Sequence, residues 1–254
     1  MKKSKETVLD AQMDANTSSE MRYFEARDRE RRAVKRLIAA AVVEHYLSEG
    51  DSILLDAGSS LYPIAEIIAK SANTNPSRRN FTIMTHNYRA FEVLVKTAAR
   101  DQHMNIILAG GRYDQDLNAL FGNQTVLSYE DFFPRVVLLG VSGLVSEIGL
   151  FCHGNTEELA VKKAIFDKRA RDRIIVADHS KIGLLAGFRF GDSQALRANV
   201  DRCIVVTDTP AEEQAFDKRE RFSKQIQHLK SQGIEVLEVQ ADTNGPNATP
   251  SVPQ

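Results

Sequence analysis

From Gly50 onward, short apolar runs alternate with longer stretches of helical periodicity, and this alternation limits the possible folds more than any other feature. The apolar runs, typical of strands, cover residues 52–55, 81–84, 105–108, 136–139, 173–177, 203–206 and 234–239. Helical stretches lie between most of them, at residues 62–72, 88–99, 157–170 and 211–231. Strands that alternate with helices form right-handed crossovers. The sequence therefore predicts an α/β fold, a mainly parallel sheet with helices on both faces.

The two ends differ from this central part. Residues 1–18 and 241–254 are polar and without periodicity, which predicts disordered tails. No Gly/Ser-rich linker divides the rest, so residues 19–240 are expected to form a single domain. A helix is predicted over residues 21–47, with its apolar stripe in the second half. The charged first half, residues 19–32, is expected to extend from the domain as an interface segment or connector, the alternative being that it frays in solvent.

Charge and hydropathy exclude several classes of protein. Lys and Arg number 33 against 34 Asp and Glu, so the net charge of -1 gives no overall footprint for nucleic acid. No run reaches the roughly 18 apolar residues that span a bilayer, so no membrane partner is expected. Acidic residues follow the basic N-terminus where a secretory signal needs an apolar core, which favours a cytoplasmic protein. In that compartment, Cys152 and Cys203 are expected to be reduced structural thiols.

Five successive predicted strands end in small, hydroxyl-bearing or charged residues. Ligands bind at the carboxyl ends of parallel strands, where glycine allows close approach and serine hydroxyls or helix amides suit a phosphate. Taken singly, Ser59 or Ser60 could simply cap a helix after a tight turn. The five segments are Asp56-Ala57-Gly58-Ser59-Ser60, Thr85-His86-Asn87, Gly110-Gly111-Arg112, Gly140-Val141-Ser142-Gly143 and Asp178-His179-Ser180-Lys181.

Common cofactor and catalytic motifs are missing from the sequence. No Gly-x-Gly-x-x-Gly follows the first predicted strand, and no Gly-x-x-x-x-Gly-Lys-Ser/Thr occurs, so we expect no nucleotide cofactor. His86, His153 and His179 have no zinc-ligand spacing, so no metal is expected either. Ser142 is followed two residues later by Leu144, where a nucleophile elbow requires its second glycine, which argues against an acyl-transfer nucleophile.

Taken together, the motifs resemble one family across roughly residues 33–210. That family is the sugar-phosphate-sensing C-terminal domain of DeoR-type bacterial transcription regulators. The Asp-x-Gly-Ser-Ser and Asp-His-Ser-Lys segments are its most specific features. The matching segments are Lys35-Arg36-Leu37-Ile38-Ala39, residues 50–60, Ile83-Met84-Thr85-His86-Asn87, Leu108-Ala109-Gly110-Gly111, Gly140-Val141-Ser142-Gly143, Gly149-Leu150, residues 158–163, Ala177-Asp178-His179-Ser180-Lys181 and Val206-Thr207-Asp208.

The resemblance implies a fold shared with ribose-5-phosphate isomerase, glucosamine-6-phosphate deaminase and coenzyme A transferases. It also implies that a phosphorylated sugar or related anionic metabolite lies over the strand ends. Gly58, Ser59 and Ser60 would hold the phosphate or hydroxyl groups, and Lys181 would supply a cation at the mouth. The full set of candidate ligand-binding residues is Asp56, Gly58, Ser59, Ser60, Thr85, His86, Asn87, Gly110, Gly111, Ser142, Gly143, Lys163, Asp178 and Lys181.

Three functions follow from these observations. The favoured one is a ligand-sensing regulatory domain that acts as a homo-oligomer, a state that the resemblance also implies. Family members usually begin with a winged helix-turn-helix, which does not fit ahead of a helix starting near residue 21, so no direct DNA binding by this chain alone is expected. The alternatives are an isomerase or deaminase with Glu147, Glu157 or Asp178 as base beside Lys181, and a purely structural or partner-binding role.

Overall fold

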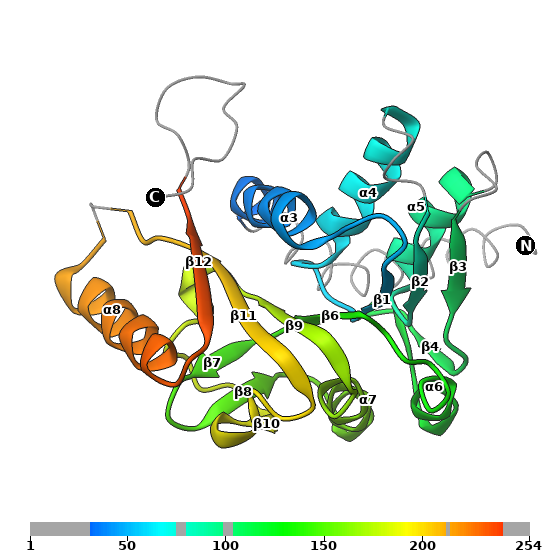
Figure 1. Ribbon diagram of the computed structural model, residues 1–254. Helices are drawn as coiled ribbons and strands as arrows, with labels where there is room; N and C mark the ends of the chain where they lie inside the picture. The colour runs from blue at the N-terminus through cyan, green and yellow to red at the C-terminus, as the bar shows by residue number, and fades with distance from the viewer. Residues whose placement is uncertain (1–30, 75–79, 99–103, 212–213, 241–254) are drawn as a thin grey trace, which may run out of the picture.

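The centre of the molecule is a seven-stranded sheet in which every neighbouring pair of strands is parallel (Figure 1). The computed structural model describes residues 31–74, 80–98, 104–211 and 214–240. Across the sheet the strands follow the order β12 (Glu235–Val239), β11 (Val200–Asp208), β9 (Ala170–Val176), β6 (Val136–Gly140), β1 (Ser52–Leu55), β2 (Thr82–Thr85) and β3 (Asn105–Leu108). This arrangement confirms the predicted parallel α/β sheet.

The order of the strands reverses between β1 and β6. From β1 the chain proceeds outward through β2 to β3, then returns to β6 on the other side of β1 and proceeds outward again to β12. The two strands are in register, with Leu55 opposite Leu138. Connections leave these two strands in opposite directions, so a crevice forms outside their carboxyl ends.

Helices cover both faces of the sheet, and each face has its own apolar core. α3 (Arg32–Tyr46), α4 (Tyr62–Thr74) and α5 (Tyr88–Ala98) pack on one face, against side chains that include Ile53 and Leu55. α7 (Thr156–Phe166) and α8 (Phe216–Ser231) cover the other face, onto which Leu54 points. Side chains alternate between the faces of a strand. The central strands are therefore apolar throughout, as expected for a sheet covered on both sides.

Short elements absent from the predicted pattern fill the loops beyond the sheet. β4 (Arg112–Asp114) and β5 (Ala119–Phe121) form an antiparallel hairpin followed by α6 (Asn123–Ser128). β7 (Gly143–Val145), β8 (Gly149–Cys152) and β10 (Phe188–Asp192) form a separate three-stranded antiparallel sheet. Two short 3-10 turns, η2 (His179–Lys181) and η3 (Ser193–Ala195), complete the described elements. These strands are too short to show a periodic pattern in the sequence.

Several predicted boundaries were wrong. The helix expected over 157–170 ends at Phe166, and β9 already begins at Ala170. The sequence did not indicate the start of that strand, because it contains charged residues. Asp172 is nevertheless buried there, since it is paired with Arg202, whose Nε lies 2.7 Å from Asp172 Oδ1. The helix expected over 211–231 begins only at Phe216.

The helix predicted over 21–47 begins at Arg32, because Arg31 adopts a left-handed backbone conformation with φ 53°. Residues 19–30 of the expected charged extension lie outside the described residues, as do the two predicted tails. Cys152 and Cys203 are both buried and neither forms a disulfide. Within the described ranges, no helix has the length and apolar character needed to cross a bilayer.

Candidate functional site

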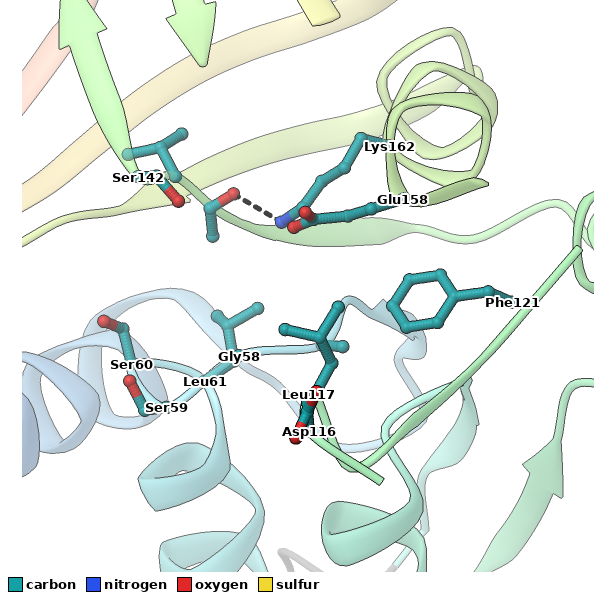
Figure 2. A pocket seen from close by; sticks show the side chains of 13 residues that line it. Gly58, Ser59, Ser60, Leu61, Asp116, Leu117, Phe121, Ser142, Glu158 and Lys162 are labelled. Carbon is teal, nitrogen blue, oxygen red and sulfur yellow. Dashed lines mark hydrogen bonds between the residues drawn. The ribbon is translucent and has the colours of Figure 1, made fainter. Parts of the chain in front are cut away.

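A cleft opens at the carboxyl ends of β1 and β6, at the reversal point of the strand order. Four segments converge on it: the loop after β1, the loop after β6, the β4–β5 hairpin, and one face of α7 (Figure 2). Its lining residues are Ala57, Gly58, Ser59, Ser60, Leu61, Asp116, Leu117, Phe121, Gly140, Val141, Ser142, Glu158 and Lys162.

The loop after β1 presents backbone amides to the cleft. Gly58 has φ +134°, a conformation that favours glycine, and its carbonyl accepts hydrogen bonds from the first amides of the following helical turn. No described residue accepts a hydrogen bond from the amides of Ser59 and Ser60. Ser59 Oγ accepts a hydrogen bond from Lys35 Nζ at 3.1 Å, which brings a buried cation from α3 against the loop. This end of the cleft is therefore rich in donors for an anion.

A buried ion pair connects β1, β6 and α7 at the base of the cleft. Asp56 is fully buried and accepts hydrogen bonds from Lys162 Nζ and from the Gly140 amide, the latter at 2.9 Å. Lys162 Nζ also donates to the Gly140 carbonyl at 2.7 Å. Asp56 thus neutralises Lys162, and the ion pair holds α7 against the ends of β1 and β6. The other charged groups that line the cleft are the carboxylates of Asp116 and Glu158.

His86 lies beneath this ion pair. Its Nε2 is 3.6 Å from Asp56 Oδ1, and Tyr129 Oη lies 2.8 Å from its Nδ1. Burial lowers the pKa of His86 to about 4, an effect that the Asp56 carboxylate opposes and the Lys162 cation reinforces. Burial also raises the pKa of Tyr129 well above its usual value.

Thr85 and Asn87 support the neighbouring elements and do not line the cleft. Thr85 Oγ1 donates to the Leu55 carbonyl at 2.7 Å and accepts from the Asn87 amide at 3.0 Å. Asn87 Oδ1 accepts from the Ala90 amide at 3.1 Å and so caps the first turn of α5. The sequence grouped both residues with the ligand site because they follow a strand, although their own hydrogen bonds fix the turn.

Gly110, Gly111 and Gly143 also lie outside the cleft lining. Gly111 has φ +137°, and a Cβ there would lie 2.2 Å from Thr125 Oγ1. A Cβ on Gly143 would lie 2.1 Å from the Leu184 carbonyl oxygen. Gly111 and Gly143 therefore permit close packing of the hairpin and of the small antiparallel sheet.

The structure places Gly58, Ser59, Ser60 and Ser142 of the predicted set together in the cleft, with Asp56 directly beneath. Lys163 lies on the exposed side of α7, whereas its neighbour Lys162 lines the cleft together with Glu158. The sequence analysis missed Lys162 and Glu158 as site residues. Their i,i+4 spacing on the face of α7 that also carries Val161 and Ile165 was the available signal.

The residues proposed for an enzymatic role are not assembled in the cleft. Asp178 accepts from the Ser180 amide at 3.0 Å and lies 3.8 Å from Arg31 NH1, while Lys181 is half-buried at the end of η2. Glu147 is exposed in the β7–β8 turn, where Gln225 Nε2 donates to it at 3.1 Å. Glu157 forms an ion pair with Arg112 that joins α7 to the β4–β5 hairpin. None of these four residues lines the cleft.

We predict that the Asn155→Ala variant will lose about 1 kcal/mol of stability. Asn155 Oδ1 accepts hydrogen bonds from the amides of Glu157 and Glu158, at 3.0 and 2.9 Å, and so caps the helix that carries Lys162. Urea unfolding followed by circular dichroism measures the loss. Asn155→Asp keeps an acceptor at the cap and should retain the stability, so equal losses in both variants would contradict the capping role.

Comparison with known families places most of the chain in one of them. Residues 30–208 match the model of the DeoR C-terminal sensor domain. The transcriptional repressor AccR of Agrobacterium fabrum is 30% identical over 59% of this chain and 53% of its own length. The putative aga operon transcriptional repressor of Escherichia coli O157:H7 is 23% identical over 81% of this chain and 65% of its own. The glycerol-3-phosphate regulon repressor of Escherichia coli K12 is 27% identical over 69% of this chain and 62% of its own length.

The chain thus spans between about half and two thirds of the length of these curated relatives. Among solved structures, ribose 5-phosphate isomerase A from Methanocaldococcus jannaschii aligns with a TM-score of 0.42 and 11% identity, covering 58% of this chain and 53% of that one. The ribose 5-phosphate isomerase from Plasmodium falciparum aligns with a TM-score of 0.41 and 14% identity, covering 59% of this chain and 52% of that one.

Proposed function

We propose, from the fact that this chain belongs to the family of DeoR C-terminal sensor domains, that its cleft binds a phosphorylated sugar or a closely related anionic metabolite. Binding would then regulate a transcriptional repressor. The matched relatives are named as repressors, and the name of one contains a phosphorylated polyol, glycerol 3-phosphate. The family supports a regulatory, ligand-sensing role, and the chemistry of the cleft supports the class of ligand.

One observation carries the proposal: the lining of the cleft combines donors suited to a phosphate with acceptors suited to hydroxyl groups. The Gly58–Ser60 loop offers amide and hydroxyl donors beside the Lys35 cation, which suits a phosphate group. The lining also includes the carboxylates of Asp116 and Glu158, which accept hydrogen bonds from sugar hydroxyls. A molecule with one phosphate and several hydroxyl groups satisfies both kinds of lining residue.

We predict that Ser60→Ala will weaken binding by about 1 to 3 kcal/mol, the range for losing a hydrogen bond to a charged group. Ser60 is half-buried, and its hydroxyl has no hydrogen-bond partner among the described residues, so its removal should leave the fold intact. The measurement is calorimetric titration with whichever compound of a sugar-phosphate panel raises the melting temperature most.

Ser48→Ala is the matched control, because Ser48 precedes β1 and so lies at the amino end of this strand, whereas the cleft lies at the carboxyl end. Glu158→Gln adds a second control: it should weaken binding of the sugar phosphate more than binding of inorganic phosphate. Equal affinities for wild type and Ser60→Ala would contradict the site. Conversion of the bound aldose phosphate to its ketose by the wild-type protein would favour the enzymatic alternative instead.

A further inference from the structure

A second cavity lies outside the cleft, between the turn after β9, the end of β11 and the first half of α8. It encloses about 190 Å³. None of its lining residues lines the cleft between β1 and β6. They are Arg31, His179, Ser180, Ile182, Gly183, Leu184, Pro210, Gln214, Lys218, Arg221 and Phe222.

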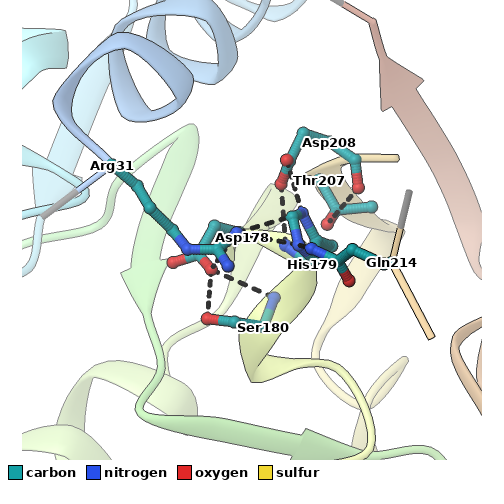
Figure 3. Close-up of polar contacts among 7 residues, drawn as sticks. All are labelled: Arg31, Asp178, His179, Ser180, Thr207, Asp208 and Gln214. Carbon is teal, nitrogen blue, oxygen red and sulfur yellow. Dashed lines mark hydrogen bonds and ion pairs between the residues drawn. The ribbon is translucent and has the colours of Figure 1, made fainter. Parts of the chain in front are cut away.

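His179, one of the lining residues, is held by polar contacts with its neighbours (Figure 3). Its ring Nδ1 lies 2.6 Å from Asp208 Oδ2, and its backbone amide donates to Asp208 Oδ1 at 2.7 Å. With the Nδ1 proton directed to Asp208, Nε2 is an acceptor for Arg31 NH1 at 2.8 Å and for the Gln214 amide at 2.9 Å. The carboxylate of Asp178 is engaged by the amide of Ser180. The nearby acidic groups are therefore held in contacts within the protein.

Two cations line the opposite wall of the cavity. Lys218 and Arg221 are spaced i,i+3 on α8 and so lie on the same side of the helix. Within the described part of the chain, neither forms an ion pair, and the nearby Glu220 pairs instead with Lys224 at 2.8 Å. The stem of Arg221 lies over Gly183, where a Cβ would be 3.0 Å from Arg221 Cδ. Gly183 has φ +78°, so this loop conformation favours glycine and keeps the arginine stem close.

The charge balance of the cavity differs from that of the cleft. Arg31, Lys218 and Arg221 contribute three positive charges, against the two carboxylates of Asp178 and Asp208 behind His179. In the cleft, Asp56 neutralises Lys162, and the two carboxylates of Asp116 and Glu158 outnumber the single Lys35 cation beside Ser59. The second cavity is therefore the more electropositive of the two. Arginine and lysine side chains around a hollow of this size match a phosphate group, with arginine able to bind two oxygens at once.

We propose that this basic pocket is a second anion site, which binds the phosphate group of a small metabolite independently of the cleft. Apolar side chains, Ile182, Leu184 and Phe222, form the remaining wall and restrict the pocket to a compact ligand.

The test is titration of the full chain with inorganic phosphate, observed by phosphorus NMR and calorimetry, in a Ser60→Ala background that weakens the cleft. The double variant Lys218→Ala with Arg221→Ala should reduce the affinity of the remaining phosphate site by about tenfold or more, since it removes charge-assisted hydrogen bonds. Both side chains are exposed on α8, and circular dichroism verifies that the variant is folded.

The matched control is Arg219→Ala with Lys224→Ala, which removes the same net charge from the same helix at positions that do not line the pocket. It should leave the phosphate affinity within about twofold. Equal losses of phosphate affinity in the two double variants would show a general surface-charge effect and overturn the proposal. The proposal would also be overturned if neither double variant changed the phosphate affinity, or if the Ser60→Ala background bound no phosphate. Failure of the cleft assignment is distinguishable, because it appears as unchanged sugar-phosphate affinity in Ser60→Ala alone.

Discussion

The Lys162→Met variant should lose about 3 to 5 kcal/mol of stability, the usual cost of removing one partner from a buried ion pair. Asp56 is fully buried, and its carboxylate is paired with the Lys162 ammonium group, so removing this group leaves a buried negative charge without that partner. The Gly140 carbonyl would lose the same donor. Methionine has a similar length and keeps most of the packing, so the loss reports mainly on the charge. Urea unfolding at pH 7 measures it as a shift of the midpoint at constant slope.

Lys163→Met is the matched control, because the same substitution one position along α7 falls on an exposed side chain. Its effect should stay within about 0.5 kcal/mol. Adding Asp56→Asn to Lys162→Met should recover part of the lost stability, since the pair then contains no unbalanced charge. Similar losses of stability in Lys162→Met and Lys163→Met would show that the buried ion pair does not stabilise the fold.

Much of the fold was accessible from the sequence because its central strands are buried on both faces. Continuous apolar runs such as residues 53–55 and 136–139 are typical of strands in a covered sheet, and their alternation with helical stretches indicated the α/β class. The reversal at β1 and β6, by contrast, depends on which strands pair, and no local pattern encodes that order. The hairpin β4–β5 and the β7–β8–β10 sheet were missed because three to five residues show too little periodicity.

The candidate site was accessible only in part, for a related reason. Glycine and serine after a strand indicate a loop near a ligand, and this placed Gly58, Ser59, Ser60 and Ser142 together. Whether Lys162 or Lys163 faces the cleft depends on the rotation of α7, which two adjacent lysines do not reveal by themselves and which only their spacing from the apolar Val161 and Ile165 indicates. Asp178 and Lys181 also follow a strand, yet η2 closes Asp178 onto Ser180, outside the cleft.

Acidification below pH 6.5 should destabilise the protein through His86. Burial lowers the pKa of this histidine to about 4 in the folded chain, against an ordinary value of 6.5. Between these two values the unfolded chain binds a proton that the folded chain does not. The contribution of His86 to the free energy of unfolding is therefore greatest above pH 6.5 and falls as the pH decreases toward 4. Each unit of difference between the two pKa values corresponds to about 1.4 kcal/mol, so the total loss is about 3 kcal/mol.

The measurement is urea unfolding at intervals between pH 7.5 and 4.5, in wild type and in His86→Asn. Asparagine places an amide near the position of Nδ1, within reach of Tyr129, and does not titrate. The variant should lose stability at pH 7 and show a much shallower dependence on pH. His153→Asn is the control, because His153 is exposed and its removal should leave the wild-type slope. A His86→Asn slope equal to that of wild type would exclude His86 as the group responsible.

The two predictions are connected, because Lys162 and His86 share Asp56 as a neighbour. The Lys162 cation lowers the pKa of His86 and the Asp56 carboxylate raises it, in addition to the dominant effect of burial. Replacing Lys162 by Met removes a positive charge while the carboxylate stays, so the pKa of folded His86 should move upward, closer to 6.5. The pH window over which stability changes should then become narrower than in wild type. The unfolding series repeated with Lys162→Met measures this change, and Lys163→Met should leave the window as it is in wild type.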